Sequence, residues 1–174
     1  TGMSSRLEEF VDLFPIHPSY IDVFNKLYLI ENRHILKNIS TTIKGIFDTT
    51  VPENAPGIIS FDNYWPAIKS NGLLKSDPTI SRVVGASQQL EDIITRAFPK
   101  PAYKPMAMQI IYALSVHRLT TNGLDVQFGM TAENLKDDLC LYMLMPEQDA
   151  DFLLSAVKVT LKEIMTTVSG QFII

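Results

Sequence analysis

The sequence predicts a mainly α-helical protein in two parts, residues 1–100 and residues 101–174. Apolar residues recur at helical spacing along most of the chain, and residues that commonly cap helices precede several of these stretches. The stretch "PKPAYKP", residues 99–105, contains three prolines. Because proline interrupts regular structure, this stretch is the predicted domain boundary.

The first part is predicted to be helical from residue 4 to residue 47. A short helix over residues 4–13 is followed by "HPSYIDVFNKLYLI" and "ENRHILKNISTTIKGIF". The apolar positions of these two stretches are Ile21, Phe24, Leu27, Leu29, Ile35, Leu36, Ile39, Ile43, Ile46 and Phe47. The breaker-rich "DTTVPENAPG" then predicts a loop over residues 48–60, with a short extended piece at "GIIS".

The long stretch "SDPTISRVVGASQQLEDIITRAF" predicts the helix that closes the first part. Asp77 is suited to cap it, and Pro78 suits the first helical position, where a missing N–H costs nothing. Its predicted buried face consists of Ile80, Val83, Val84, Leu90, Ile93 and Ile94.

The second part has the element order of a winged helix whose wing is truncated. A mostly apolar helix over residues 104–118 precedes a short strand, "LDVQF". Thr131 then opens the helix "TAENLKDDLCLYM", whose acidic first turn suits the helix dipole. Another helix begins near Pro146 and ends at Gly170, before a strand in "QFII".

The stretch "FPIHPSYIDVF" places two prolines around His17. Pro18 suits the first turn of a helix, which makes His17 the capping residue and gives it an extended backbone. Ile16 and Ile21 then have the spacing of a hydrophobic staple. We therefore interpret the motif as a rigid elbow before a helix, in preference to a catalytic or metal-binding role for His17.

Composition and charge exclude few functions. The net charge of −4 favours no nucleic-acid partner, and the second part is the more acidic one. Cys140 has no disulfide partner in the chain, which predicts a reducing, cytoplasmic location. Its apolar neighbours, with Asp137 and Asp138, favour a core thiol over a nucleophile. No apolar run is long enough to span a bilayer, and no signal-peptide pattern is present.

Known catalytic motifs are absent from the sequence. It contains no GxxxxGK[ST] phosphate loop, GxGxxG, HExxH or paired-cysteine spacing. His17, His34 and His117 are far apart, so no metal site is predicted. His117 and Arg118 are interpreted as residues that complement a helix C-terminus.

Arg33 is the candidate site residue, with two interpretations left open. It begins an amphipathic stretch, where it could be solvated and paired with Glu31. Alternatively it contacts a phosphate at the edge of a nucleotide site, because guanidinium geometry matches phosphate oxygens.

The apolar end of the chain, "GQFII", leads us to expect a piece of a longer protein. An exposed hydrophobic edge strand invites aggregation, so a natural domain seldom ends on one.

Several segments together resemble the middle of the large P-loop ATPases of BREX-type phage exclusion systems. These segments are "FPIHPSYIDVF", "ENRHILKNIS", "KPMAMQIIYALSVHRLTT", "GMTAENLKDDLCLY" and "VSGQFII". The resemblance implies an AAA-type helical lid over residues 1–100, followed by a winged-helix-like domain over 101–174. It also implies a nucleotide-binding core upstream in the same chain, with ATP and Mg bound there, and other phage-defence proteins as partners.

By position, Arg33 stands where the resemblance implies a sensor arginine facing the nucleotide phosphate, and the "FPIHP" elbow would join the lid to the core. The phosphate loop, its lysine and the magnesium-holding acid are missing, so hydrolysis by these residues alone is not expected. The proposed DNA-reading helix, residues 147–168, carries more acidic than basic residues, and phosphates would repel it.

The leading hypothesis is therefore a non-catalytic lid and protein-contact module of a phage-defence ATPase. One alternative is a regulatory module that binds DNA through its winged helix. The other is a helical scaffold domain with no ligand of its own.

Overall fold

The computed structural model describes residues 7–27, 37, 40, 41, 43–45, 50, 57–121, 129–141 and 149–168. Its α-helices within these ranges are α1 (Leu7–Leu13), α2 (Pro18–Lys26), α4 (Tyr64–Ser70), α5 (Pro78–Ala97), α6 (Lys104–Thr120), α7 (Ala132–Asp138) and α8 (Ala150–Thr167). Short 3₁₀ helices are η2 (Phe61–Asn63), η3 (Leu74–Ser76) and η4 (Pro101–Tyr103). Residues 37, 40, 41 and 43–45 are also helical. The expectation of a mainly α-helical protein is confirmed.

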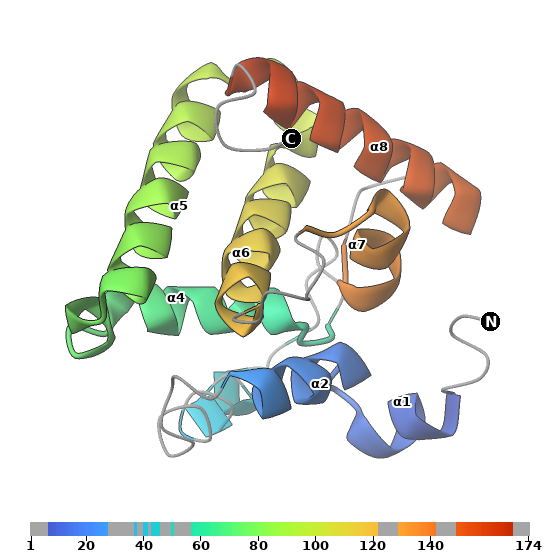
Figure 1. Ribbon diagram of the computed structural model, residues 1–174. Helices are drawn as coiled ribbons and strands as arrows, with labels where there is room; N and C mark the ends of the chain where they lie inside the picture. Colours follow the sequence, from blue (N-terminus) through green and yellow to red (C-terminus); the bar gives the residue numbers. More distant parts are fainter. Residues whose placement is uncertain are drawn as a thin grey trace.

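Helices α5 and α6 lie side by side, with α6 near the centre of the fold and α5 at its edge (Figure 1). Helix α8 packs against both, and α4 lies across the opposite end of the pair. Buried side chains occur on most sides of α6, which is typical of a helix enclosed by others. They are Met106, Ala107, Ile110, Ile111, Ala113, Ser115, Val116 and Leu119.

The hydrophobic core contains residues from both sides of the stretch 99–105. Ile94 of α5 and Ile110 of α6 are both fully buried in it, as is Trp65 of α4. On the predicted inner face of α5, Ile80, Val84, Leu90 and Ile94 are buried, while Val83 and Ile93 are partly buried against the core. The boundary between 1–100 and 101–174 stays a prediction.

Two predicted helix starts are confirmed by their caps. The Asp77 carboxylate accepts hydrogen bonds from the backbone N–H groups of Thr79 and Ile80, at 2.8 and 3.1 Å. The Thr131 hydroxyl accepts from the Asn134 N–H at 3.1 Å, and the Asn134 side chain accepts from the Thr131 N–H. These side chains satisfy N–H groups that the first helical turn leaves without partners.

The helix predicted over residues 131–143 is shorter than expected, because α7 ends at Asp138. Leu139 is extended, and the Cys140 N–H donates to the Ser60 hydroxyl at 3.3 Å. Leu139 and Leu141 are buried, whereas Cys140 between them is only partly buried. Burial therefore alternates along this segment, as it does along an extended chain. Burial of these two leucines and the bond to Ser60 replace further helical hydrogen bonds.

The last helix starts later than predicted. The sequence places its beginning near Pro146, whereas α8 begins at Ala150. Asp149 caps it, with a carboxylate oxygen that accepts from the Asp151 N–H at 3.1 Å. Helices α5 and α6, by contrast, lie within two residues of their predicted bounds. The predicted start of the first helix at residue 4 lies outside the described residues.

The predicted extended piece at "GIIS" is confirmed at a single position. Ile59 forms an isolated parallel bridge with Ile16. The predicted strands "LDVQF" and "QFII" lie outside the described residues. The lid and the winged helix therefore stay predictions. In the described part of the chain, no helix combines the length and the apolarity needed to cross a membrane.

Candidate functional site

The elbow before α2 forms as the sequence predicts. His17 is the N-cap of α2, and its Nδ1 accepts from the Ser19 N–H at 3.1 Å. The imidazole is buried, and the ring of Phe10 meets it edge-on, with 4.7 Å between ring centroids. The cap and the ring contact account for the His17 side chain as a structural group.

Backbone hydrogen bonds fix the elbow against the start of η2. The Ile59 N–H donates to the Pro15 carbonyl at 2.8 Å, and the His17 N–H donates to the Ile59 carbonyl at 2.9 Å. Nearby, the rings of Tyr20 and Tyr64 stack with centroids 4.0 Å apart. These contacts orient α2 relative to η2 and α4.

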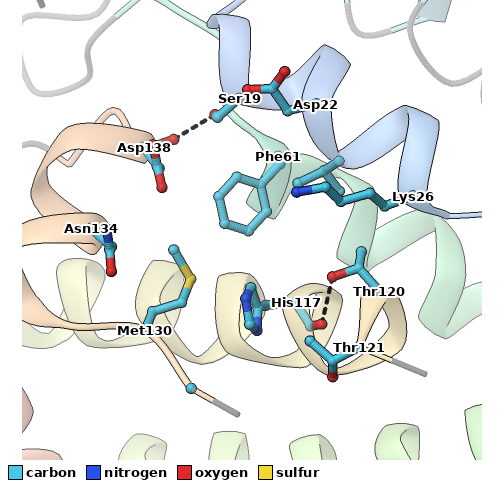
Figure 2. Close-up of a pocket in the computed structure, with 12 residues that line it drawn as sticks. Ser19, Asp22, Lys26, Phe61, His117, Thr120, Thr121, Met130, Asn134 and Asp138 are labelled. Carbon is cyan, nitrogen blue, oxygen red and sulfur yellow. Dashed lines mark hydrogen bonds between the residues drawn. The ribbon is translucent and has the colours of Figure 1, made fainter. Parts of the chain in front are cut away.

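A second connection joins α2 to the end of α7. The Ser19 hydroxyl donates to the Asp138 carbonyl at 2.6 Å (Figure 2). The same hydroxyl lies 2.7 Å from His17 Nδ1. Ser19 and Asp138 are 119 positions apart in the chain. One serine at the start of α2 therefore links the elbow to the second half of the sequence.

Ser60 and Asp62 are buried polar residues, and the partly buried Cys140 lies next to them. The Ser60 hydroxyl donates to the Asp62 carboxyl, and burial raises the pKa of Asp62 above its ordinary value. Burial, with a smaller contribution from the charge of Asp62, raises the pKa of Cys140 to about 12. Cys140 therefore stays a thiol at physiological pH. Its side chain is only partly buried, so it lies at the edge of the core and not within it as predicted.

A pocket of about 570 Å³ opens between α2, the C-terminal end of α6 and α7. Figure 2 shows Phe61 near the middle of the residues drawn, with Lys26 and His117 on the α2 and α6 sides. We call this the α2–α6–α7 pocket. Its lining residues are Ser19, Asp22, Val23, Lys26, Phe61, His117, Thr120, Thr121, Gly129, Met130, Asn134 and Asp138.

The electrostatics of the pocket are mixed. Asp22 and Lys26 bring charges of opposite sign from α2. Burial, and then the neighbouring Lys26 ammonium, hold the pKa of His117 below its ordinary value of 6.5. A neutral imidazole both donates and accepts hydrogen bonds. The pocket therefore suits a polar group of low net charge, such as a main-chain amide or a polar side chain.

Two threonine hydroxyls at the C-terminal end of α6 donate hydrogen bonds to backbone carbonyls of the same helix. Thr120 donates to the His117 carbonyl at 2.7 Å, and Thr121 donates to the Arg118 carbonyl at 3.1 Å. Arg118 Nη1 lies 3.3 Å from the Thr121 hydroxyl. These bonds satisfy carbonyls at the helix end, where the sequence predicts a role for His117 and Arg118.

The predicted site residue Arg33 lies outside the described residues, as does His34. Among the residues that are described, no group of three His, Cys, Asp or Glu side chains could hold a metal ion. Sequence reasoning missed Lys26, Asp22 and Asn134 as pocket residues. Asp22 and Lys26 have the four-residue spacing of one helix face, which could have signalled a shared surface. No local pattern connects them to Asn134 on α7.

Comparison of the sequence with protein families gives one match. The family described as the DUF6079 second domain matches residues 1–174. The chain belongs to that family. No curated protein and no solved structure matches the chain. The match to the DUF6079 second domain covers both the elbow and the α2–α6–α7 pocket.

Proposed function

We propose that this chain is a non-catalytic helical module of a large cytoplasmic P-loop ATPase that acts in phage exclusion. The observation that carries the proposal is the match of residues 1–174 to a family described as a second domain, which supports work as part of a longer chain. The resemblance of five sequence segments to phage-exclusion ATPases supports the ATPase and its function. ATP and Mg would bind to the upstream core.

Within this proposal, residues 1–100 act as a lid and Arg33 contacts the nucleotide phosphate. The support is the position of Arg33 in the resembling segment "ENRHILKNIS". A guanidinium group suits such a contact because it is planar and always charged. Lys37 and Thr41, four and eight residues after Arg33 in the sequence, are helical.

The second role in the proposal is contact with other proteins of the defence system. The mixed charge and the neutral His117 of the α2–α6–α7 pocket suit a polar segment of a partner.

DNA binding by the winged helix is the alternative, and the ion pairs of α8 weigh against it. Lys158 lies 3.0 Å from Glu133 of α7, and Lys100 lies 2.8 Å from Glu163 of α8. Each pair neutralises a cation that phosphate contacts would require. A helix with acidic residues on its surface is a poor reader of a DNA groove.

The test of the lid role uses the complete protein with Arg33→Ala. We expect ATP turnover to fall while the melting temperature stays unchanged, because the substitution removes a phosphate contact and no core group. Lys37→Ala is the matched control, since Lys37 is an exposed cation four residues away. Turnover equal to that of the parent protein would show that Arg33 is not a sensor.

A DNA titration at two salt concentrations distinguishes the proposed protein-contact role from the DNA-binding alternative. The proposed protein-contact role predicts no binding by residues 1–174. Tight binding that weakens steeply with salt would favour the DNA-binding module instead, because phosphate contacts release counterions.

A further inference from the structure

Helix α1 carries apolar side chains on its outer surface. Leu7, Val11 and Phe14 are 61%, 69% and 70% exposed. Their spacing of four and three residues places them along one side of the helix and its immediate continuation. We call these three side chains the α1 apolar face. Large apolar groups gathered in this way mark a contact surface.

Burial of its own side chains does little to stabilise α1. The helix has seven residues and none of them is buried. Phe10 reaches His17, and the Leu13 carbonyl accepts from the Ile16 N–H at 2.7 Å. A helix shorter than about 12 residues is marginal in water, so packing must hold it in place. Another protein surface packed against the α1 apolar face would supply that packing.

We propose that the α1 apolar face is the docking surface for the domain that precedes this one in the longer protein. The inference rests on the proposed function, because it takes the chain as a second domain with a first domain before it. The preceding domain would present an apolar surface with basic residues at its edge. Those basic residues would face Glu8 and Asp12, which are exposed beside the α1 apolar face.

The position of α1 favours a preceding domain as the partner that covers the α1 apolar face. It lies at the N-terminal end of the matched range, the end at which a first domain would join. Tethering gives such a domain a high effective concentration, and a small contact is then sufficient.

A second copy of this chain and a membrane are weaker candidates. Three side chains on a helix about 10 Å long fall far short of the roughly 1,000 Å² that a stable interface between separate chains buries. Glu8 and Asp12 would be repelled by the anionic lipids of a cytoplasmic leaflet. An apolar face of this size with acidic neighbours fits a tethered protein domain.

Hydroxyl-radical footprinting of the complete protein tests the inference. We expect Leu7, Val11 and Phe14 to be modified severalfold more slowly than Leu73, after correction for the intrinsic reactivity of each residue type. Leu73 is the internal standard, because it is 78% exposed and lies in a different part of the fold. The protection should not depend on protein concentration, since the occupant belongs to the same chain.

The substitution Val11→Glu should raise the modification of Phe14 to the level of Leu73, while the matched control Leu73→Glu should leave Phe14 protected. Val11→Ser repeats the test with a smaller change, should the charged variant fold poorly. Equal modification of Phe14 and Leu73 in the parent protein would overturn the proposal. Protection that requires high protein concentration or anionic vesicles would overturn it too, in favour of a second copy or a membrane.

ATP turnover measured on the same samples separates this inference from the proposed function. Protection of the α1 apolar face without any ATP turnover would support docking and contradict the ATPase assignment. Turnover without protection would contradict docking alone.

Discussion

Asp62 is a buried carboxyl group whose surroundings favour its neutral form. Its side chain lies in the core beside Ser60 and Cys140, and burial is the largest cause of its raised pKa. A group with a raised pKa in the folded state contributes stability below its unfolded value of 3.8. That contribution is lost as the pH rises through the folded pKa. The Asp62 carboxyl therefore makes the fold less stable above pH 3.8 than below it.

Asp62→Asn should raise the free energy of unfolding at pH 7–8, because an amide accepts the Ser60 hydrogen bond without a buried charge. The gain should shrink as the pH falls and disappear below about 3.8, where the wild-type carboxyl is protonated in both states. Urea denaturation across this pH range measures it. Asp92→Asn, at an exposed position of α5, is the control and should show no such gain. A stability loss at pH 8 would contradict the assignment.

The contribution of His117 to folding stability changes with pH in the opposite direction to that of Asp62. Its folded pKa lies below the ordinary 6.5, so the unfolded chain binds more protons as the pH falls past that value. Stability that is present above pH 6.5 should therefore decline toward the folded pKa. His117→Gln should flatten this decline in a thermal-melt series. Lys26→Gln should reduce it, since the Lys26 ammonium contributes to the lowered pKa. An unchanged pH profile in both variants would count against this account.

At the scale of elements, capping decides where the described helices begin. His17, Asp77, Thr131 and Asp149 each accept a hydrogen bond from the first turn of a helix. Pro18 and Pro78 follow two of these caps at the first helical position, where their fixed backbone angle is already helical. These signals are local in the chain, which explains why sequence reasoning found three of the four.

Asp77→Ala should destabilise the chain by about 1 kcal/mol, because two N–H groups at the start of α5 lose their acceptor. Asp77→Asn keeps an acceptor oxygen and should stay close to wild type. Chemical denaturation followed by circular dichroism measures both. A result in which the two variants lose the same stability would show that the carboxylate acts through its charge.

At the scale of the whole molecule, Glu91 connects three helices. Its carboxylate accepts from Lys69 at 2.7 Å, and Trp65 Nε1 and the Tyr112 hydroxyl each lie 3.4 Å from it. These partners come from α4 and α6, while Glu91 itself belongs to α5. One partly buried acid thus satisfies donors on both helices beside it.

Glu91→Ala should cost about 1–2 kcal/mol of unfolding free energy, because it leaves partly buried donors without an acceptor. The emission of Trp65, the single tryptophan of the chain, should shift as its indole N–H loses its partner. Glu91→Gln retains an acceptor oxygen and should lose less. If both variants match the parent protein in stability and emission, the connection is unimportant.

The sequence by itself determined the helical class, the caps at His17, Asp77 and Thr131, and the inner face of α5. All of these depend on residues close together in the chain, whose spacing sets backbone angles and burial. Only the tertiary structure decided that α7 ends at Asp138, because the competing partner of Cys140 is Ser60, 80 residues away. The α2–α6–α7 pocket likewise arises only where three distant segments meet, so no local pattern could predict it.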